Sequence, residues 1–129
     1  MSTGLIWLGC TLFLALAQIF LAAAAKRQQD STSWAMGNRD GEPPHYTGVA
    51  ARLSRAQQNL FETLPIFIGA VLLAHVSGHD GRMVAWGAGL YFWARVLYVP
   101  AYAYGWGPRR TMIWFVSILG LLLVFAGVL

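Results

Sequence analysis

Four long apolar segments alternate with polar connections along this chain of 129 residues. Together with the polar residues that lead into the second and the fourth, the predicted helices cover residues 4–25, 52–76, 83–104 and 109–129. Each has about the 20 residues that a helix needs to cross about 30 Å of hydrocarbon, where a helix satisfies its own backbone hydrogen bonds. The pattern predicts an all-α integral membrane protein, a four-transmembrane-helix bundle forming a single domain over residues 1–129.

A polar stripe leads into the apolar part of the second helix. Arg52, Arg55, Asn59 and Glu62 follow at spacings of three, four and three residues, which places them on one helical face within about 80°. For Arg52, a solvated first turn explains the pattern equally well. It does not explain Glu62, which lies beyond Leu60, where the apolar run begins. An ionised carboxylate inside a span costs about 2.5–3.5 kcal/mol and usually pairs, so the stripe predicts a binding site.

A second polar stripe lies on the third helix. Arg95, Tyr98 and Tyr102 are three and four residues apart, share one face and approach the same end of the bundle as the first stripe. An arginine inside a span needs an acceptor. Glu62 and an anionic ligand are the two candidates. Other aromatic residues near predicted helix ends are typical of interfacial anchors, namely Trp7, Trp86, Tyr104 and Trp106.

The composition agrees with a membrane protein and indicates its orientation. Hydrophobic residues make up 57% of the chain and charged residues 11%, against about 25% charged residues in soluble domains. The net charge of +4 is not gathered in a long basic run, which argues against a nucleic-acid partner. Basic residues flank the first and third connections, whereas Arg82 is alone in the second. The positive-inside rule therefore predicts that connections one and three are cytoplasmic and that both termini lie on the opposite side.

The sequence indicates no metal site. His45, His75 and His79 show no metal-ligand spacing with Cys10 or with a cluster of carboxylates. Cys10 lies inside the first apolar segment, where a packing role is expected. We expect that segment to be a membrane span and no cleaved signal peptide, because no basic residue precedes its apolar core. The connection over residues 26–51 is consistent with a binding loop and equally with a mobile surface loop.

The second helix also carries a motif that points to a family. The run Arg55-Ala56-Gln57-x-Asn59-x-x-Glu62-x-x-Pro65-x-Phe67 resembles the second-helix signature of the MAPEG family, the membrane-associated proteins in eicosanoid and glutathione metabolism. Arg95 with Tyr98 and Tyr102 is similar to the third-helix pattern of that family. Arg110-Thr111 resembles the Arg-Ser pair that opens its fourth helix. The resemblance covers essentially the whole chain and is strongest to bacterial members that resemble microsomal glutathione transferases.

This resemblance implies a homotrimer that binds glutathione as co-substrate between neighbouring subunits, near the cytoplasmic face. Glutathione has two carboxylates that guanidinium groups can pair with, an amino group for a carboxylate, and amides that Asn, Gln and Tyr side chains can hold. The residues that the resemblance implies for this site are Arg52, Arg55, Gln57, Asn59, Glu62, Arg95, Tyr98 and Tyr102, with Arg27 as a further charge contact.

For catalysis, the resemblance implies an arginine near the start of the fourth helix that stabilises the glutathione thiolate. Arg110 is the first choice and Arg109 the second, while anchoring of both to anionic headgroups is an alternative. Thr111 stands where the family usually has serine, and its hydroxyl can donate to sulfur. The implied activity is that of a glutathione transferase or peroxidase acting on lipophilic electrophiles or lipid hydroperoxides, with no metal.

Two other function classes remain open. One is a non-catalytic lipid-binding or partner-binding protein of the same family, because the family includes a member without activity and fold alone does not select a reaction. The other is a small four-span transporter, which the first span disfavours because residues 4–25 contain no Asp or Glu. Gln58 stands where some synthases carry an arginine, and nothing indicates an eicosanoid substrate. A bacterial inner membrane fits so short a chain, and an internal eukaryotic membrane is also open.

Overall fold

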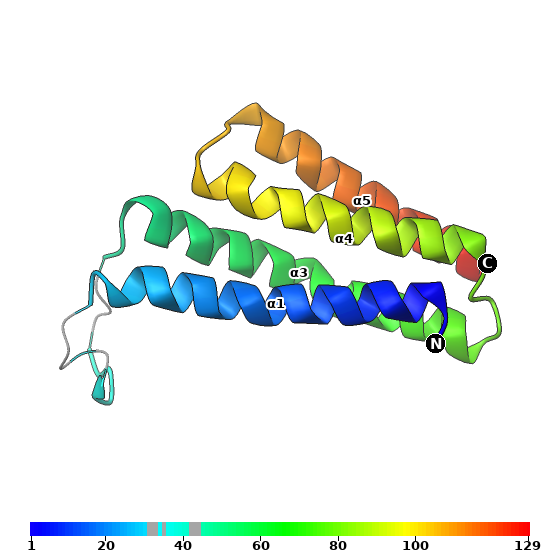
Figure 1. Ribbon diagram of the computed structural model, residues 1–129, viewed down its shortest axis with the longest axis horizontal. Helices are drawn as coiled ribbons and strands as arrows, with labels where there is room; N and C mark the ends of the chain where they lie inside the picture. The colour runs from blue at the N-terminus through cyan, green and yellow to red at the C-terminus, as the bar shows by residue number, and fades with distance from the viewer. Residues whose placement is uncertain (31–33, 35, 42–44) are drawn as a thin grey trace.

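The described part of the chain is built from four α-helices. The computed structural model describes residues 1–30, 34, 36–41 and 45–129, and no strand occurs among them. The helices are α1 (Thr3–Arg27), α3 (Gly48–Val76), α4 (Arg82–Ala103) and α5 (Pro108–Val128) (Figure 1). The all-helical fold predicted from the hydrophobic pattern is confirmed.

The four helices run along one common long axis (Figure 1). The two chain termini lie at one end of the bundle, and the connection between α1 and α3 lies at the other. At this second end α1 ends, α3 begins, α4 ends and α5 begins. We call it the basic end, because it carries most of the cationic side chains: Lys26, Arg27, Arg39, Arg52, Arg55, Arg109 and Arg110.

Three of the helices, α1, α3 and α5, are long and apolar enough to cross a membrane. The fourth, α4, is also long enough with 22 residues, but it carries the buried Arg95, and its crossing stays a prediction. The helix α3 begins at Gly48, four residues before the predicted start at 52. Arg52 and Arg55 therefore lie within the helix and not in a solvated first turn.

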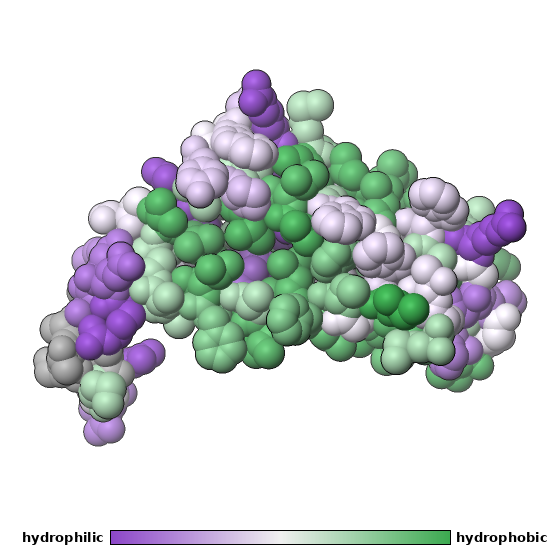
Figure 2. Space-filling view, in the orientation of Figure 1, coloured by the Kyte–Doolittle hydropathy of each residue, from purple (hydrophilic) through white to green (hydrophobic). Residues whose placement is uncertain are grey.

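The core lies where α3 and α4 pack against α1 and α5. The ring of Phe67 stacks on that of Tyr91, with centroids 4.1 Å apart. Large apolar side chains also cover the outside, among them Phe13 and Phe115 with 72% and 60% of their area exposed. Figure 2 shows one face of the bundle, with hydrophobic residues over its middle and hydrophilic residues toward its ends. Helices that are apolar on both faces are typical of membrane spans.

The largest helix interface, between α4 and α5, depends on two glycines that face each other. A Cβ atom on Gly87 would lie 2.6 Å from the carbonyl oxygen of Gly120, and one on Gly120 would lie 2.7 Å from the carbonyl oxygen of Gly87. Such contacts are shorter than real Cβ contacts. The two backbones therefore approach more closely than any side chain would allow, as small residues permit in membrane bundles.

Gly120→Ala is expected to destabilise the protein by about 1–3 kcal/mol, the usual cost of overpacking, because the backbone of α4 blocks the new methyl group. Gly69→Ala is the matched control, since a Cβ there meets nothing within 4 Å. In the control, alanine is also the better helix former. Thermal unfolding in detergent measures both variants. Equal unfolding temperatures for the two variants would contradict the close contact.

Candidate functional site

A buried arginine connects the two polar stripes. Only 1% of the area of Arg95 is exposed, and its Nη2 donates a hydrogen bond to Oδ1 of Asn59 over 3.0 Å. The guanidinium carbon lies 4.4 Å from the ring centroid of Tyr98. Nη1 has no hydrogen-bond partner among the described residues. Helices α3 and α4 therefore hold a desolvated cation with one donor group unused.

Within the chain, Arg95 bonds Asn59 and not Glu62, and an anionic ligand as a further acceptor stays a prediction. The sequence offered Glu62 or an anionic ligand, whereas the structure places the carboxamide of Asn59 there. No ion pair joins Arg95 to Glu62 in the described ranges. Glu62 is exposed on α3. The packing of α4 against α3 sets this choice, because it places the guanidinium of Arg95 beside Asn59, one helical turn closer than Glu62 to the start of α3.

The ring of Tyr102, on α4, contacts arginines from α3 and α5. The guanidinium carbon of Arg110, from α5, lies 4.5 Å from its ring centroid, and that of Arg55, from α3, lies 5.7 Å away. The ring also packs edge-on against Tyr98, with centroids 5.6 Å apart. Both arginines are within the distance at which a cation is attracted to an aromatic face. Tyr102 therefore fixes two positive charges beside each other.

These arginines surround a pocket, which we call the arginine pocket. It has a volume of about 350 Å³ and is lined by Arg52, Arg55, Tyr102, Gly105, Gly107 and Arg110. Arg52 is held by a hydrogen bond of 2.9 Å from its Nη1 to the carbonyl oxygen of Ala103, at the end of α4. No acidic residue of the described chain lines the pocket. Three guanidinium groups and no carboxylate make this an anion-binding site by charge.

A smaller cavity adjoins the arginine pocket, and we call it the threonine pocket. Its volume is about 210 Å³, and it is lined by Asn59, Tyr98, Tyr102, Arg110, Thr111 and Trp114. Tyr102 and Arg110 line both cavities, so Arg110 stands between them. Arg109 is exposed and lines neither. Trp114 was missed by the sequence reasoning, although it lies three residues after Thr111 and hence on the same helical face.

Two residues that the resemblance placed in the same site lie elsewhere in this chain. Gln57 and Arg27 line a third cavity of about 750 Å³, between α1, α3 and the connection. At 100° per residue, Gln57 is about 200° around α3 from Arg55, so one helix cannot turn both toward the same space. Within a single chain, the predicted site residues are therefore divided between two faces.

The connection next to this third cavity is tied together by polar contacts that the sequence did not reveal. Gln29 bonds the backbone of Thr47 twice, with its Nε2 donating to the carbonyl oxygen at 3.0 Å and its Oε1 accepting from the amide at 3.1 Å. The hydroxyl of Tyr46 donates to Oδ1 of Asp30 over 2.6 Å. This hydrogen bond raises the pKa of Tyr46 above its ordinary value, because the carboxylate favours the protonated phenol.

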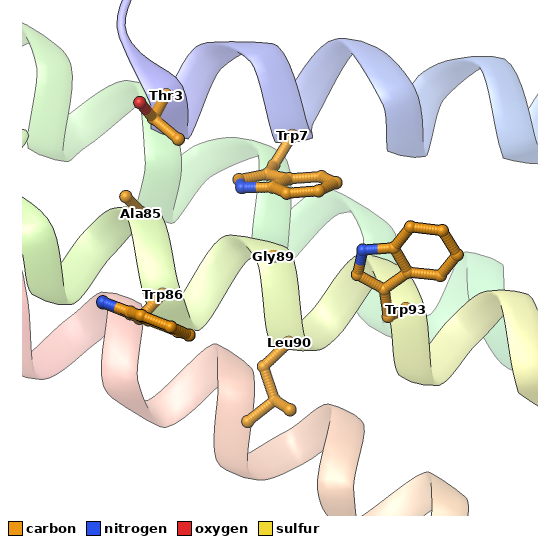
Figure 3. A pocket seen from close by; sticks show the side chains of 7 residues that line it. All are labelled: Thr3, Trp7, Ala85, Trp86, Gly89, Leu90 and Trp93. Carbon is orange, nitrogen blue, oxygen red and sulfur yellow. The ribbon is translucent and has the colours of Figure 1, made fainter.

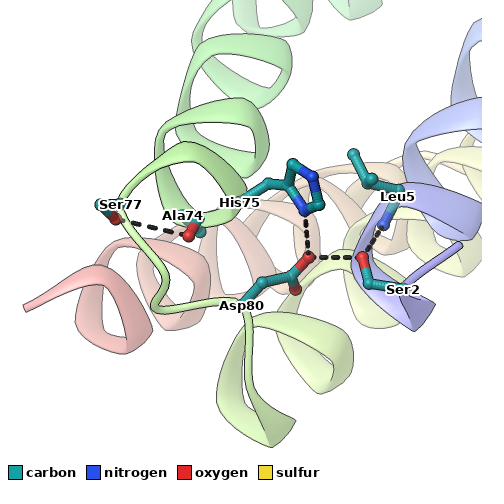
Figure 4. Close-up of polar contacts among 6 residues, drawn as sticks. All are labelled: Ser2, Leu5, Ala74, His75, Ser77 and Asp80. Atoms are coloured by element: carbon teal, nitrogen blue, oxygen red, sulfur yellow. Dashed lines mark hydrogen bonds and ion pairs between the residues drawn. The ribbon is translucent and has the colours of Figure 1, made fainter.

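A polar cluster closes the opposite end of the bundle (Figure 4). Ser2 bonds Oδ2 of Asp80 and accepts a hydrogen bond from the amide of Leu5 over 3.2 Å, so that it caps α1. Nδ1 of His75 lies 3.4 Å from the same carboxylate oxygen. The cluster ties the start of α1 to the connection between α3 and α4. Among the residues the structure describes, no three His, Cys, Asp or Glu side chains are grouped to hold a metal ion.

The comparisons with known proteins give one positive result. The model of the MAPEG family matches residues 5–129, which is essentially the whole chain. Against curated proteins and against solved structures, the chain has no match.

Proposed function

The chain belongs to the MAPEG family, and we propose that it is a membrane enzyme that joins glutathione to lipophilic electrophiles or uses it to reduce lipid hydroperoxides. Membership of the family fits glutathione-related or eicosanoid metabolism in general. The main support for glutathione as the substrate is the arginine pocket, in which three guanidinium groups line one cavity of about 350 Å³.

The arginine pocket suits the carboxylates of glutathione. Guanidinium groups bind carboxylates through two parallel hydrogen bonds, and bonds between charged groups are about twice as strong as neutral ones. Arg52 uses one of its five N–H donors on Ala103, which leaves the others for a ligand. Arg55 is exposed, lies about one turn after Arg52 on α3 and lines the same pocket. Two carboxylates of one ligand would thus meet separate cations.

We propose that Arg110 stabilises the glutathione thiolate. A free thiol has a pKa of about 8.5, and a neighbouring cation lowers it by favouring the charged form. Tyr102 holds the Arg110 guanidinium at the boundary between the two cavities, and Thr111 lines the threonine pocket. The thiol sulfur would lie at that boundary, with carboxylates in the arginine pocket and the electrophile in the threonine pocket.

The reaction then follows from the position of the thiolate. In a transfer, the sulfur forms a bond to an electrophilic carbon, and either the leaving group departs with its electron pair or the adduct takes up a proton. With a hydroperoxide, the sulfur attacks oxygen, the O–O bond breaks and the alkoxide takes a proton. A second glutathione then displaces hydroxide from the sulfenic acid, which gives a disulfide and water. The fixed cation and the shared cavity supply charge stabilisation and proximity.

The exposed Glu62 supports an assembly of several copies, for which we propose the predicted homotrimer. A carboxylate on the lipid-facing side of a spanning helix is costly, and a second copy of the chain would cover it. In a ring, one face of each chain packs against a different face of the next. The face with Arg27 and Gln57 would then meet the face with Arg55 and Arg110, which reunites the divided site residues. By the positive-inside rule, this basic end would be cytoplasmic.

Calorimetric titration of glutathione into detergent-purified protein tests the binding step. We expect saturable binding by the wild type and binding at least tenfold weaker in Arg55→Ala, since a lost hydrogen bond to a charged group costs about 1.5–3 kcal/mol. Arg82→Ala is the control, because it removes an exposed arginine at the other end of α4. Absence of binding to folded wild-type protein would contradict the proposal.

A further inference from the structure

A groove lies on the outside of the bundle, far from the basic end and from the pockets proposed to bind glutathione. It lies between α1 and α4 near their first turns and has a volume of about 440 Å³ (Figure 3). We call it the tryptophan groove. Its lining residues are Thr3, Trp7, Ala85, Trp86, Gly89, Leu90 and Trp93. None of these lines the arginine or threonine pocket.

The groove exists because a small residue lets α1 approach α4. A Cβ on Gly89 would lie 3.0 Å from Cε2 of Trp7, so the indole of Trp7 lies against the bare backbone of α4. Trp7 also packs edge-on against Trp93, with ring centroids 6.3 Å apart. Trp86 is 76% exposed and Trp93 is 55% exposed. The groove therefore has indole walls and opens to the outside of the bundle.

The groove has one polar end and one apolar end. Figure 3 shows the hydroxyl of Thr3 and the indole nitrogens of Trp7 and Trp86 toward the end at which α1 and α4 begin. Leu90 and Trp93 lie farther along the helices, toward the middle of the bundle. Among the described residues, the side chains of Thr3, Trp7 and Trp86 make no hydrogen bond to another side chain. Indole N–H groups at a membrane boundary ordinarily have an acceptor.

We propose that the tryptophan groove binds one acyl chain of a membrane glycerophospholipid. The chain would lie along Gly89, Leu90 and Trp93, and the ester carbonyl groups would accept hydrogen bonds at the polar end. No charged residue of the described chain lines the groove, so the phosphate and the headgroup lie outside it. Occupancy therefore depends on the acyl chain and the ester, and changes little with the headgroup.

A helix of a second copy fits this groove less well than a lipid. An α-helix with its side chains is about 10–12 Å wide, whereas a hydrocarbon chain is far thinner and bends to follow a narrow channel. The carbonyl groups of a spanning helix are already bonded within that helix. A neighbouring helix would thus offer no free acceptor to the indole N–H groups, and an ester does.

The test is photo-crosslinking in nanodiscs that contain phosphatidylcholine with a diazirine in one acyl chain. In the wild type we expect labelling concentrated in residues 85–93 and 3–7. Gly89→Leu and Ala85→Leu each fill the groove and should reduce labelling there at least fivefold. Ala85→Leu leaves Trp7 in contact with Gly89, so its effect cannot come from displacement of that ring. Replacing phosphatidylcholine by phosphatidylglycerol carrying the same diazirine chain should leave the labelling unchanged.

Gly9→Leu is the matched control on α1, because a Cβ there meets nothing within 4 Å. It should retain wild-type labelling, and the unfolding temperature of each variant verifies folding. Equal labelling in filled and control variants, or labelling spread evenly over outward residues such as Phe13 and Phe115, would overturn the proposal. So would a covalent dimer formed on irradiation of a variant with a photoreactive amino acid at position 86, because a second copy of the chain would then occupy the groove. Glutathione titration is independent of this result, since the groove lies at the other end of the bundle.

Discussion

Replacing Arg110 by alanine is expected to reduce the rate of glutathione conjugation by about 100-fold to 1,000-fold, the cost of removing one preorganised group that stabilises a developing negative charge. Arg110 lines both the arginine pocket and the threonine pocket, and Tyr102 fixes its guanidinium. Under the proposed mechanism, its loss would return the pKa of the bound thiol toward about 8.5. The measurement is the conjugation of chlorodinitrobenzene by detergent-purified protein.

Two further variants make this experiment decisive. Arg109→Ala tests the second candidate arginine, and because Arg109 lines neither pocket we expect it to keep most of the activity. Arg82→Ala controls for the loss of a positive charge at the far end of α4. An Arg110→Ala variant as active as the wild type would exclude our role for Arg110. Inactivity of wild-type protein that still binds lipid would favour the non-catalytic alternative.

The second large effect concerns the buried contact between α3 and α4. Asn59→Leu is expected to destabilise the protein by about 1.5–3 kcal/mol, because Nη2 of Arg95 loses its only described acceptor while the cation stays buried. Thermal unfolding measures the loss. We expect Asn59→Asp to retain more of the stability, since a carboxylate of the same length accepts the same hydrogen bond.

Gln58→Leu is the matched control for Asn59→Leu. Gln58 is the neighbouring residue on α3, has an amide side chain like Asn59 and is exposed. The same amide-to-leucine change there should leave the unfolding temperature nearly unchanged. If both variants unfolded at the same temperature, Asn59 would not be the group that stabilises Arg95.

Local periodicity predicted much of the fold and the two polar stripes. The spacing of Arg52, Arg55 and Asn59 is a property of one helix, so the sequence suffices to put them on one face. The apolar runs in the sequence likewise predict that α1, α3 and α5 are long enough to cross a membrane. Their bounds differ most at the start of α3, where the short run from Gly48 to Ala51 continues the helix ahead of the polar stripe.

The contacts between helices could not be predicted from a single sequence. The choice of Asn59 over Glu62 as acceptor for Arg95 depends on how α4 is set against α3, which no spacing within one helix records. The facing pair Gly87 and Gly120 likewise becomes visible only when α4 and α5 are packed. Trp7 was predicted to be an interfacial anchor, and its contact with Gly89 shows that it also shapes a groove.

Stabilisation of the glutathione thiolate by Arg110 can be tested by the ultraviolet absorbance of the thiolate at neutral pH, measured as glutathione is added to the protein. We expect a thiolate signal that saturates together with binding in the wild type. In Arg110→Ala the signal should be lost while binding through Arg52 and Arg55 persists. Saturable binding to the wild type with no thiolate signal, or a signal unchanged in Arg110→Ala, would contradict the proposed role of Arg110.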